Sequence, residues 1–336
     1  MAGPERKDTI MNKLLRRPSG IVAISIICIT CLVAIFAYLL VPDSTPFANR
    51  MIVELGAKQP GFSKQLLLVP KSTKQERHSK LFEWFNGATS DYDAVPLNAY
   101  TFQNDKLIVT HYIDEGMQDT LVYALARLMP AEKANLNSDQ QQKYIETQQI
   151  IQRRFYLGTD RYGRDILSRL IVGSRVSIAV GLIAVLLSLT IGIVLGSLAG
   201  YFGGIVDNMV MWLINILWAI PTLLLVFAIT LTIGKGFWEI FVAIGLTMWV
   251  GAARLIRGQV LVLREMEYIT AAKAIGLSDI RIIFRHIVPN IAGPLMVIAA
   301  SNFATAILIE AGLSFLGFGV QPPHPSWGLM IKEHYN

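Results

Sequence analysis

The sequence holds few of the residues that catalysis, metal binding or disulfide formation need. Its two cysteines, Cys28 and Cys31, lie inside one apolar run and indicate no redox compartment. No P-loop or zinc-protease motif occurs. The histidines His111, His286 and His324 are scattered along the chain. We therefore expect no enzyme, no metal site and no cofactor of the chain's own.

Charge is scarce over long stretches of the chain. Of the 336 residues, 53% are hydrophobic and 16% are charged. Residues 21–41 contain no charge and would span about 31 Å as a helix, close to a hydrocarbon core of about 30 Å. Further apolar runs lie at 176–199, 209–233, 237–253 and 291–309. We predict an all-α polytopic membrane protein with five spans.

Basic residues set the expected orientation of these spans. Two groups flank the first and the last run: Arg6, Lys7, Lys13, Arg16 and Arg17, and Arg254, Arg257, Arg264, Lys273, Arg281 and Arg285. The positive-inside rule places both groups in the cytoplasm. The arginines between 153 and 175 end a loop of more than 100 residues, and such loops cross largely regardless of charge. The N-terminal segment 1–20 is therefore expected to be cytoplasmic.

Residues 42–155 differ in composition from the rest of the chain. They carry charged and amide side chains, with strand-like runs LLLVP (66–70) and KLIVTHY (106–112). A Gln-rich segment at 139–152 predicts a helix. We predict a folded, mixed α/β extracytoplasmic insert. The aromatic patch LFEWF (81–85) is expected to be local core, since ligand binding is the less common use of such a patch.

A charged segment precedes the last apolar run. REMEYITAAKAI (264–275) is rich in helix formers, and Ala271 with Ala272 would give a small-residue surface for close approach by another protein. Gly276 suits the left-handed residue that ends a helix, and Ser278 can cap the next one.

The second of these helices is expected to finish near Val288, because Pro289 disfavours helical geometry in the residue before it. Residues 264–290 would then form a helix–glycine–helix elbow leading into the fifth span. Such an elbow can transmit movement from a soluble partner to the spans. The alternative is a solvated connector.

Polar residues are rare inside the predicted spans. Candidates to line a polar pathway are Asn215, Trp218, Ser301, Asn302 and Thr305. Hydrogen bonds between helices explain the same residues equally well. Pro221 predicts a kink in the third span. Because carboxylates are missing from the span centres, a proton-coupled carrier is disfavoured and energy is expected from another chain.

Several strings together resemble a known family. They are LGTDRYGRD (157–165), AGYFGG-x2-D (199–207), AIPTLLL (219–225), ARLIRGQVLVLREMEY (253–268), EYITAAKAIGLSDIRIIFRHIVPN (267–290) and EAGLSFLGFGVQPPHPSWG (310–328). The fifth resembles the EAA signature of ABC importer permeases. Taken in order, the strings resemble the C-type permease of oligopeptide, dipeptide and nickel importers. The likeness covers about 155–336 and the first span.

The resemblance implies a type I ABC importer permease domain at 156–336 in a bacterial inner membrane. It implies a homologous permease subunit, two ATP-binding subunits that hold ATP and Mg, and an extracytoplasmic substrate-binding protein. The implied coupling residues are Glu267, Ala271, Ala272, Gly276, Ile287 and Pro289. Thr270 stands where the broader signature has Glu.

Cargo and completeness are separate expectations. Peptides are favoured by family frequency, with nickel or another solute left open. The family continues into a sixth span beyond KEHYN, so the chain is expected to be C-terminally incomplete. A membrane-anchored sensor, with residues 42–155 as its ligand-binding domain, remains the alternative from a different class.

Overall fold

The computed structural model describes residues 17–72, 79–129, 137–234 and 236–335. The chain divides into two compact units, unit 1 (Met1–Arg175) and unit 2 (Val176–Asn336). Residues 156–175 group with the insert in unit 1. Most of the basic N-terminal segment, residues 1–16, lies outside the described residues.

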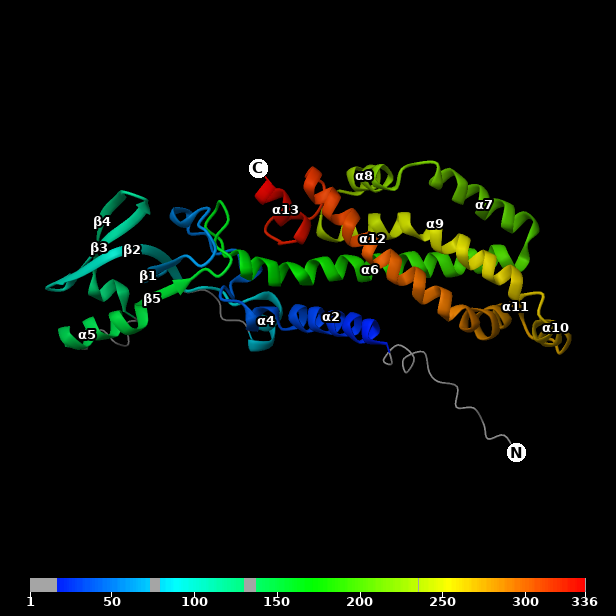
Figure 1. Ribbon diagram of the computed structural model, residues 1–336, viewed down its shortest axis with the longest axis horizontal. Coiled ribbons are helices and arrows are strands. Elements are labelled where there is room, and N and C mark those ends of the chain that lie inside the picture. Colours follow the sequence, from blue (N-terminus) through cyan, green and yellow to red (C-terminus); the bar gives the residue numbers. More distant parts are fainter. Residues whose placement is uncertain (1–16, 73–78, 130–136, 235, 336) are drawn as a thin grey trace, which may run out of the picture. The chain divides into compact units, whose positions relative to one another are not determined.

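Unit 1 combines an apolar N-terminal helix with an α/β body (Figure 1). Its helices are α2 (Pro18–Ile35), α3 (Ala37–Leu40), α4 (Lys80–Asn86) and α5 (Ser138–Tyr144), with short 3₁₀ turns at Pro46–Ala48, Val53–Leu55 and Leu125–Leu128. Its strands are β1 (Ser63–Pro70), β2 (Tyr92–Gln103), β3 (Lys106–Asp114), β4 (Met117–Ala124) and β5 (Ile150–Arg154).

The strands form one antiparallel sheet in the order β4-β3-β2-β1-β5. Tight turns with positive φ at Asn104 and Gly116 connect β2 to β3 and β3 to β4, as short hairpins require. Leu67, Leu97 and Val109 lie in the buried core of the sheet. The predicted α/β insert is therefore present.

The predicted helix at 139–152 is only half right. Helix α5 ends at Tyr144 and continues as a π-helical turn over Ile145–Gln149, and Ile150–Arg154 is strand β5. Strand β5 pairs with β1, with Ile151 opposite Leu66. The β-branched pair Ile150–Ile151 favours a strand, and pairing across the sheet outweighs the helical preference of the glutamines before it.

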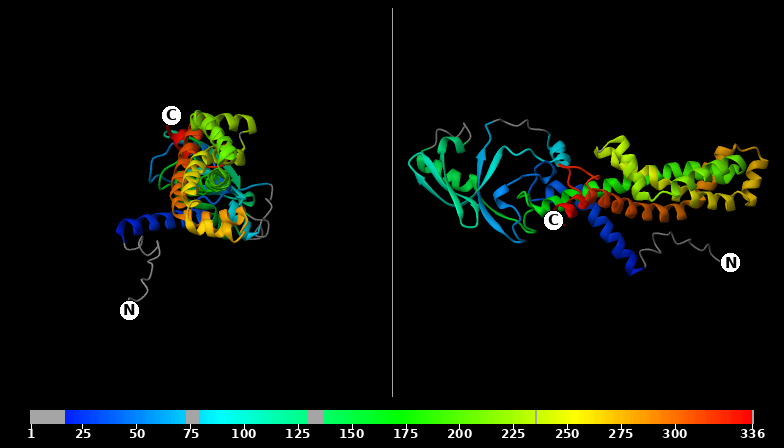
Figure 2. Two further views of the ribbon diagram at one scale, coloured as in Figure 1. Left: turned by 90° about the vertical axis from the view of Figure 1, so that its right-hand side faces the viewer. Right: turned by 90° about the horizontal axis from the view of Figure 1, so that it is seen from above.

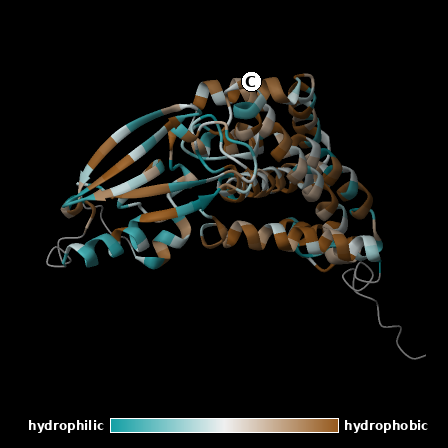
Figure 3. Ribbon diagram, turned by 60° about the vertical axis from the view of Figure 1, so that its left-hand side comes forward, coloured by the Kyte–Doolittle hydropathy of each residue, from teal (hydrophilic) through white to brown (hydrophobic). Residues whose placement is uncertain are grey.

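Unit 2 consists of helices throughout its described part. They are α6 (Ile166–Phe202, which begins in unit 1), α7 (Gly204–Trp218), α8 (Thr222–Ile233), α9 (Phe237–Leu263), α10 (Glu267–Ala274), α11 (Asp279–Ile282), α12 (Ala292–Leu316) and α13 (Trp327–Tyr335). In the views of Figures 1 and 2, α6, α9 and α12 run side by side. Figure 3 shows these helices as mainly hydrophobic, whereas the strands of unit 1 are mixed.

Glycines let α6 and α9 approach closely. A Cβ added at Gly192 would lie 2.7 Å from the Cβ of Ala252, and one at Gly196 would lie 2.5 Å from the carbonyl oxygen of Ala253. Gly192 and Gly196 are four residues apart and so share one face of α6. Transmembrane helices associate through such small residues, because lipid supplies no hydrophobic drive between helices.

Among the described residues, four helices are long and apolar enough to cross a membrane: Pro18–Ile35, Ile166–Phe202, Phe237–Leu263 and Asp279–Leu316. A bent pair, α7 and α8, would make a fifth. These two helices meet at 93° on either side of Pro221, so the predicted kink is a break. The candidate spans among the described residues thus number four, or five if the pair counts as one, and the predicted count of five stays a prediction.

Candidate functional site

Residues 264–290 form the predicted elbow, and Gly276 sets its angle. Gly276 has φ +82°, in the left-handed region. Its N–H donates to the carbonyl oxygen of Lys273 (2.9 Å), and the N–H of Leu277 donates to that of Ala272 (3.1 Å). This pair of bonds is the Schellman motif, which closes the C-terminus of α10 and turns the chain into α11.

One face of the elbow is packed against the ends of the long helices of unit 2. Ile269, Ala272 and Ile282 are buried in a cluster that includes Val260 of α9 and Tyr201 of α6. Each isoleucine is fully buried, and Ala272 is 6% exposed. This face of the elbow is therefore held to the rest of unit 2 by apolar packing.

Tyr201 also holds the elbow through polar contacts. Its hydroxyl donates to Oδ1 of Asp279 (2.6 Å), at the first residue of α11. The ammonium of Lys273 lies 4.8 Å from the centre of its ring. Tyr201 thus contacts both arms of the elbow, before and after Gly276. These contacts of Tyr201 were not predicted from the sequence, although Tyr201 belongs to the quoted string AGYFGG.

The opposite face of the elbow is exposed and partly apolar. Ile275 is 76% exposed, Ile280 67% and Phe284 52%, with Tyr268 at 42%. Exposed side chains of this size in adjacent turns are unusual unless another molecule covers them. The elbow therefore exposes large apolar side chains in addition to those that it buries.

The predicted coupling residues divide between the two faces. Glu267, Ala271, Gly276 and Pro289 are exposed, whereas Ala272 and Ile287 are buried. The expected small-residue surface therefore consists of Ala271 alone, because Ala272 packs inward.

The second arm of the elbow does not end near Val288 as predicted. Helix α11 passes through a π-helical turn, Ile283–Ile287, and a 3₁₀ turn, Val288–Ile291, directly into α12. The wider turn moves the carbonyl pairing by one residue, and Pro289 then occupies the first turn of a 3₁₀ segment, where its missing N–H is tolerated.

Three of the five pathway candidates line one cavity. Trp218, Asn302 and Thr305 surround a space of about 150 Å³, together with Thr222 and Thr247. No charged side chain belongs to the described lining. Asn215 and Ser301 are exposed and lie outside it.

The polar groups near this cavity also bond between and within helices. Nδ2 of Asn302 donates to Oγ of Ser188 on α6 (3.2 Å), and the Thr305 hydroxyl donates to the carbonyl of Ser301 (2.9 Å). The guanidinium of Arg254 lies 4.3 Å from the ring centre of Trp218. Asn302 and Thr305 therefore border the cavity and also form these hydrogen bonds, so their place in a pathway stays a prediction.

Asp207 and Arg257 join α7 to α9 in unit 2. Nη2 of Arg257 donates to Oδ2 of Asp207 at 2.5 Å, and Nε donates to Oδ1. A bidentate pair of this kind fixes orientation as well as distance. The carbonyl oxygen of Gly200, near the end of α6, accepts a hydrogen bond from Nη1 of Arg264 (2.9 Å).

In unit 1, the string LGTDRYGRD builds a buried ion-pair network. Asp160 accepts from Nε of Arg164 (2.6 Å) and Nη1 of Arg169 (2.6 Å), and all three side chains are buried. Burial alone would raise the pKa of Asp160, but the backbone amide and guanidinium of Arg164 lower it below its ordinary value.

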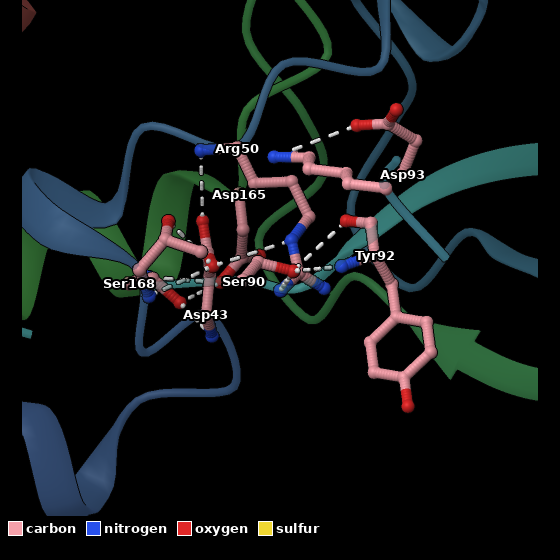
Figure 4. A network of polar contacts seen from close by, with 9 residues as sticks. Asp43, Arg50, Ser90, Tyr92, Asp93, Asp165 and Ser168 are labelled. Carbon is pink, nitrogen blue, oxygen red and sulfur yellow. Dashed lines mark hydrogen bonds and ion pairs between the residues drawn. The ribbon is translucent and has the colours of Figure 1, made fainter. Parts of the chain in front are cut away.

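A neighbouring network ties the start of the insert to α6 (Figure 4). The N–H of Asp43 donates to Oγ of Ser168 (3.0 Å), and its carboxylate accepts from the N–H of Arg50 (3.1 Å). Nη2 of Arg50 donates to Oγ of Ser90 (3.1 Å). Arg50 borders a polar cleft of about 660 Å³ in unit 1.

Across the described residues, no three or more His, Cys, Asp or Glu side chains are placed to hold a metal ion.

Residues 192–335 match the family described as "Binding-protein-dependent transport system inner membrane component". Among curated relatives, the chain is similar to the oligopeptide transport system permease protein OppC of Bacillus subtilis (strain 168), with 43% identity over 178 residues. It is similar to the glutathione transport system permease protein GsiD of Pectobacterium atrosepticum at 41% and to the dipeptide transport system permease protein DppC of Bacillus subtilis at 41%.

Each of these alignments covers 53% of this chain and, in the same order, 58%, 59% and 56% of the relative. The chain thus spans less than two thirds of their length. A solved structure of the MetNI methionine ABC transporter in inward-facing conformations matches with a TM-score of 0.42 and 19% identity, over 50% of this chain and 82% of that one. A structural similarity of that size supports no statement about the fold or function of this chain.

Proposed function

We propose that the chain, whose residues 192–335 match the binding-protein-dependent transport system inner membrane component family, is a permease subunit of an ATP-driven importer of peptides. Permeases named for oligopeptide, dipeptide and glutathione transport, at 41–43% identity, support this class of cargo. Nickel and other solutes are the alternatives that an uptake assay separates.

The observation that carries the proposal is the two-faced elbow at 264–290. Its inner face is packed on the ends of α6 and α9, and its outer face exposes Ile275, Ile280 and Phe284. A rigid body with an open apolar face suits docking of an ATP-binding subunit in the cytoplasm, because force applied at Gly276 passes directly to the helices. Ala271 and Glu267 lie at the edge of the same docking face.

The remaining parts of the proposal follow from this role. The subunit sits in the bacterial inner membrane with its N-terminus in the cytoplasm. It pairs with a homologous permease, two ATP-binding subunits and an extracytoplasmic substrate-binding protein. ATP and Mg bind to the partner subunits, so this chain performs no hydrolysis. Trp218, Asn302 and Thr305 supply half of an uncharged polar pathway, which suits peptides of differing charge.

Uptake and copurification test the proposal together. A tagged chain should retain an ATP-binding subunit after mild detergent extraction, and peptide uptake should stop when ATP is depleted. Uptake that continues without ATP, or a tagged chain that retains no ATP-binding subunit, would refute it.

A matched alanine pair tests the docking face. Ala271→Glu puts a carboxylate on the exposed face and should release the ATP-binding subunit while the chain stays folded. Ala272→Glu forces a carboxylate into the apolar cluster and should destabilise the elbow itself. Equal effects of the two variants on folding would contradict the assignment of the faces.

The polar cleft of unit 1 supports a second candidate function. Arg50, Lys71, Glu54 and Asp93 border its 660 Å³, which is large enough for a small polar ligand. A membrane-anchored sensor would use this cleft and need no ATP-binding partner. Ligand binding to unit 1, with no ATP-binding subunit retained and no uptake, would favour the sensor.

A further inference from the structure

Helix α4 presents large apolar side chains on an exposed face. Leu81 is 70% exposed, Phe85 58% and Phe82 45%. The helix is nevertheless well defined at its start, where Oγ of Ser79 accepts from the N–H of Phe82 (3.3 Å). The predicted local core at 81–85 is therefore wrong for these three residues, which are exposed, whereas Trp84 is half-buried.

Arg175 places α4 beside the end of α2. Its guanidinium donates to the carbonyl oxygens of Ala34 (2.5 Å) and Ile35 (2.6 Å), which end α2. It also donates to those of Trp84 (3.3 Å) and Phe85 (2.7 Å), which end α4. One cation thus satisfies carbonyl oxygens that both helix ends leave open.

The surface of α2 that faces outward continues onto the residues next to α4. Only 11% of the apolar α2 span is buried, so lipid is the solvent that suits it. Beyond its end, Phe36 is 40% exposed and Leu39 68%. The ring of Phe36 lies 5.8 Å from that of Trp84, centre to centre. The ring of Trp84 lies in turn 4.7 Å from that of Phe85, so apolar contacts run from the end of α2 through Phe36 and Trp84 to the exposed Phe85 of α4.

We propose that α4 is an interfacial helix, whose Leu81, Phe82 and Phe85 insert among lipids in the leaflet where α2 ends. The occupant is assigned from continuity, because the exposed face of α4 adjoins a span that lipid surrounds. Amphipathic helices bind membranes in this way, with aromatic and leucine side chains at the boundary of the acyl region. The assignment concerns unit 1 and is independent of what the chain transports.

Cysteine accessibility in the full chain tests this assignment. Cys28→Ser and Cys31→Ser remove the native thiols, and Leu81→Cys and Phe85→Cys are then introduced one at a time. Leu39→Cys serves as a lipid reference. Val122→Cys is the matched control, because Val122 is also 55% exposed but lies on β4 of the sheet. Each chain is kept in its own membrane and treated with a membrane-impermeant maleimide, and separately spin-labelled.

The labelling rate at positions 81 and 85 should lie about tenfold or more below that at 122, because burial of each large apolar side chain that remains on α4 favours the lipid-inserted state by about that factor. Spin labels at both positions should collide with oxygen, which is lipid-soluble, more than with a water-soluble nickel chelate, as at Leu39. Rapid maleimide labelling would mean that the face lies in water. Protection from maleimide, oxygen and nickel together would mean that a protein chain covers it. Either result overturns the proposal.

Discussion

Units 1 and 2 fix their structures in opposite ways. Unit 1 buries charge, with Asp160 between Arg164 and Arg169. Unit 2 instead places glycines, which have no side chain, at a helix contact: α9 lies against Gly192 and Gly196 of α6. In water the hydrophobic effect drives folding. It can therefore offset the desolvation cost of buried ion pairs that fix irregular loops. Between apolar helices in lipid that drive is missing, and close contact must replace it.

Loss of the carboxylate at Asp160 should be the most damaging change and should spare unit 2. Asp160→Asn leaves Arg164 and Arg169 buried without their counter-charge, a loss of about 3–5 kcal/mol. Hydrogen exchange across residues 43–60 and 155–170 should rise, while peptides from α9 stay protected. The control is Asp114→Asn, whose ion pair with Lys58 is exposed and should matter little.

The pH dependence of the same pair of proteins sharpens this result. Because the folded pKa of Asp160 lies below its ordinary value, its contribution to stability is fully present above about pH 4. It is lost as the pH falls from there through the folded pKa. The stability difference between wild type and Asp160→Asn should therefore be constant from pH 7 to about pH 4 and shrink below it. A difference that shrinks already near neutral pH would contradict the network.

Overpacking of the contact between α6 and α9 should destabilise unit 2. Gly196→Leu places a side chain against the backbone of Ala253 and should cost about 1–3 kcal/mol. The thermal midpoint of the detergent-extracted chain should fall, with exchange rising in α6 and α9 but not in the sheet of unit 1. Gly258→Leu is the matched control, because a Cβ there would meet no described atom within 4 Å. Equal losses in both variants would refute the close-approach argument.

A backbone change at Gly276 should act only on the elbow. Gly276→Val forces a β-branched residue into the left-handed region, which costs about 1–2 kcal/mol, although a Cβ there would meet no described atom. ATP hydrolysis should separate from uptake while membrane insertion is retained. Gly276→Asn should keep coupling, since Asn tolerates this conformation. If Gly276→Val couples normally, the angle of the elbow has no role in transport.

Tyr201→Phe should have the smallest effect. It keeps the ring in the apolar cluster but removes the hydrogen bond to Asp279, a loss of about 0.5–1.5 kcal/mol. Amide exchange should rise in residues 276–283 and remain unchanged in α12. Unchanged exchange in the elbow would show that packing alone fixes it.

Features that depend on neighbouring residues were predicted from the sequence more often than contacts between residues far apart in the chain. The left-handed conformation of Gly276 was predicted, because a glycine between two helix-forming segments commonly ends the first helix in that conformation. The inward position of Ala272 was not, since its neighbours on α6 and α9 are distant in sequence. The path through Pro289 was missed because a π-helical turn leaves no residue pattern. The contact between Tyr201 and Asp279 joins residues 78 positions apart, and only the motif AGYFGG marked one of them.

The glycine face of α6 also has a consequence for synthesis. Its partner, Ala253, follows Gly196 by 57 residues, so a ribosome adding about 5–20 residues per second delivers it about 3–11 s later. During that interval the face has no partner helix and must be held by lipid or by the insertion machinery. Substitutions on this face should therefore lower the yield of nascent chains, through proteolysis during assembly, more than they shorten the lifetime of chains already assembled.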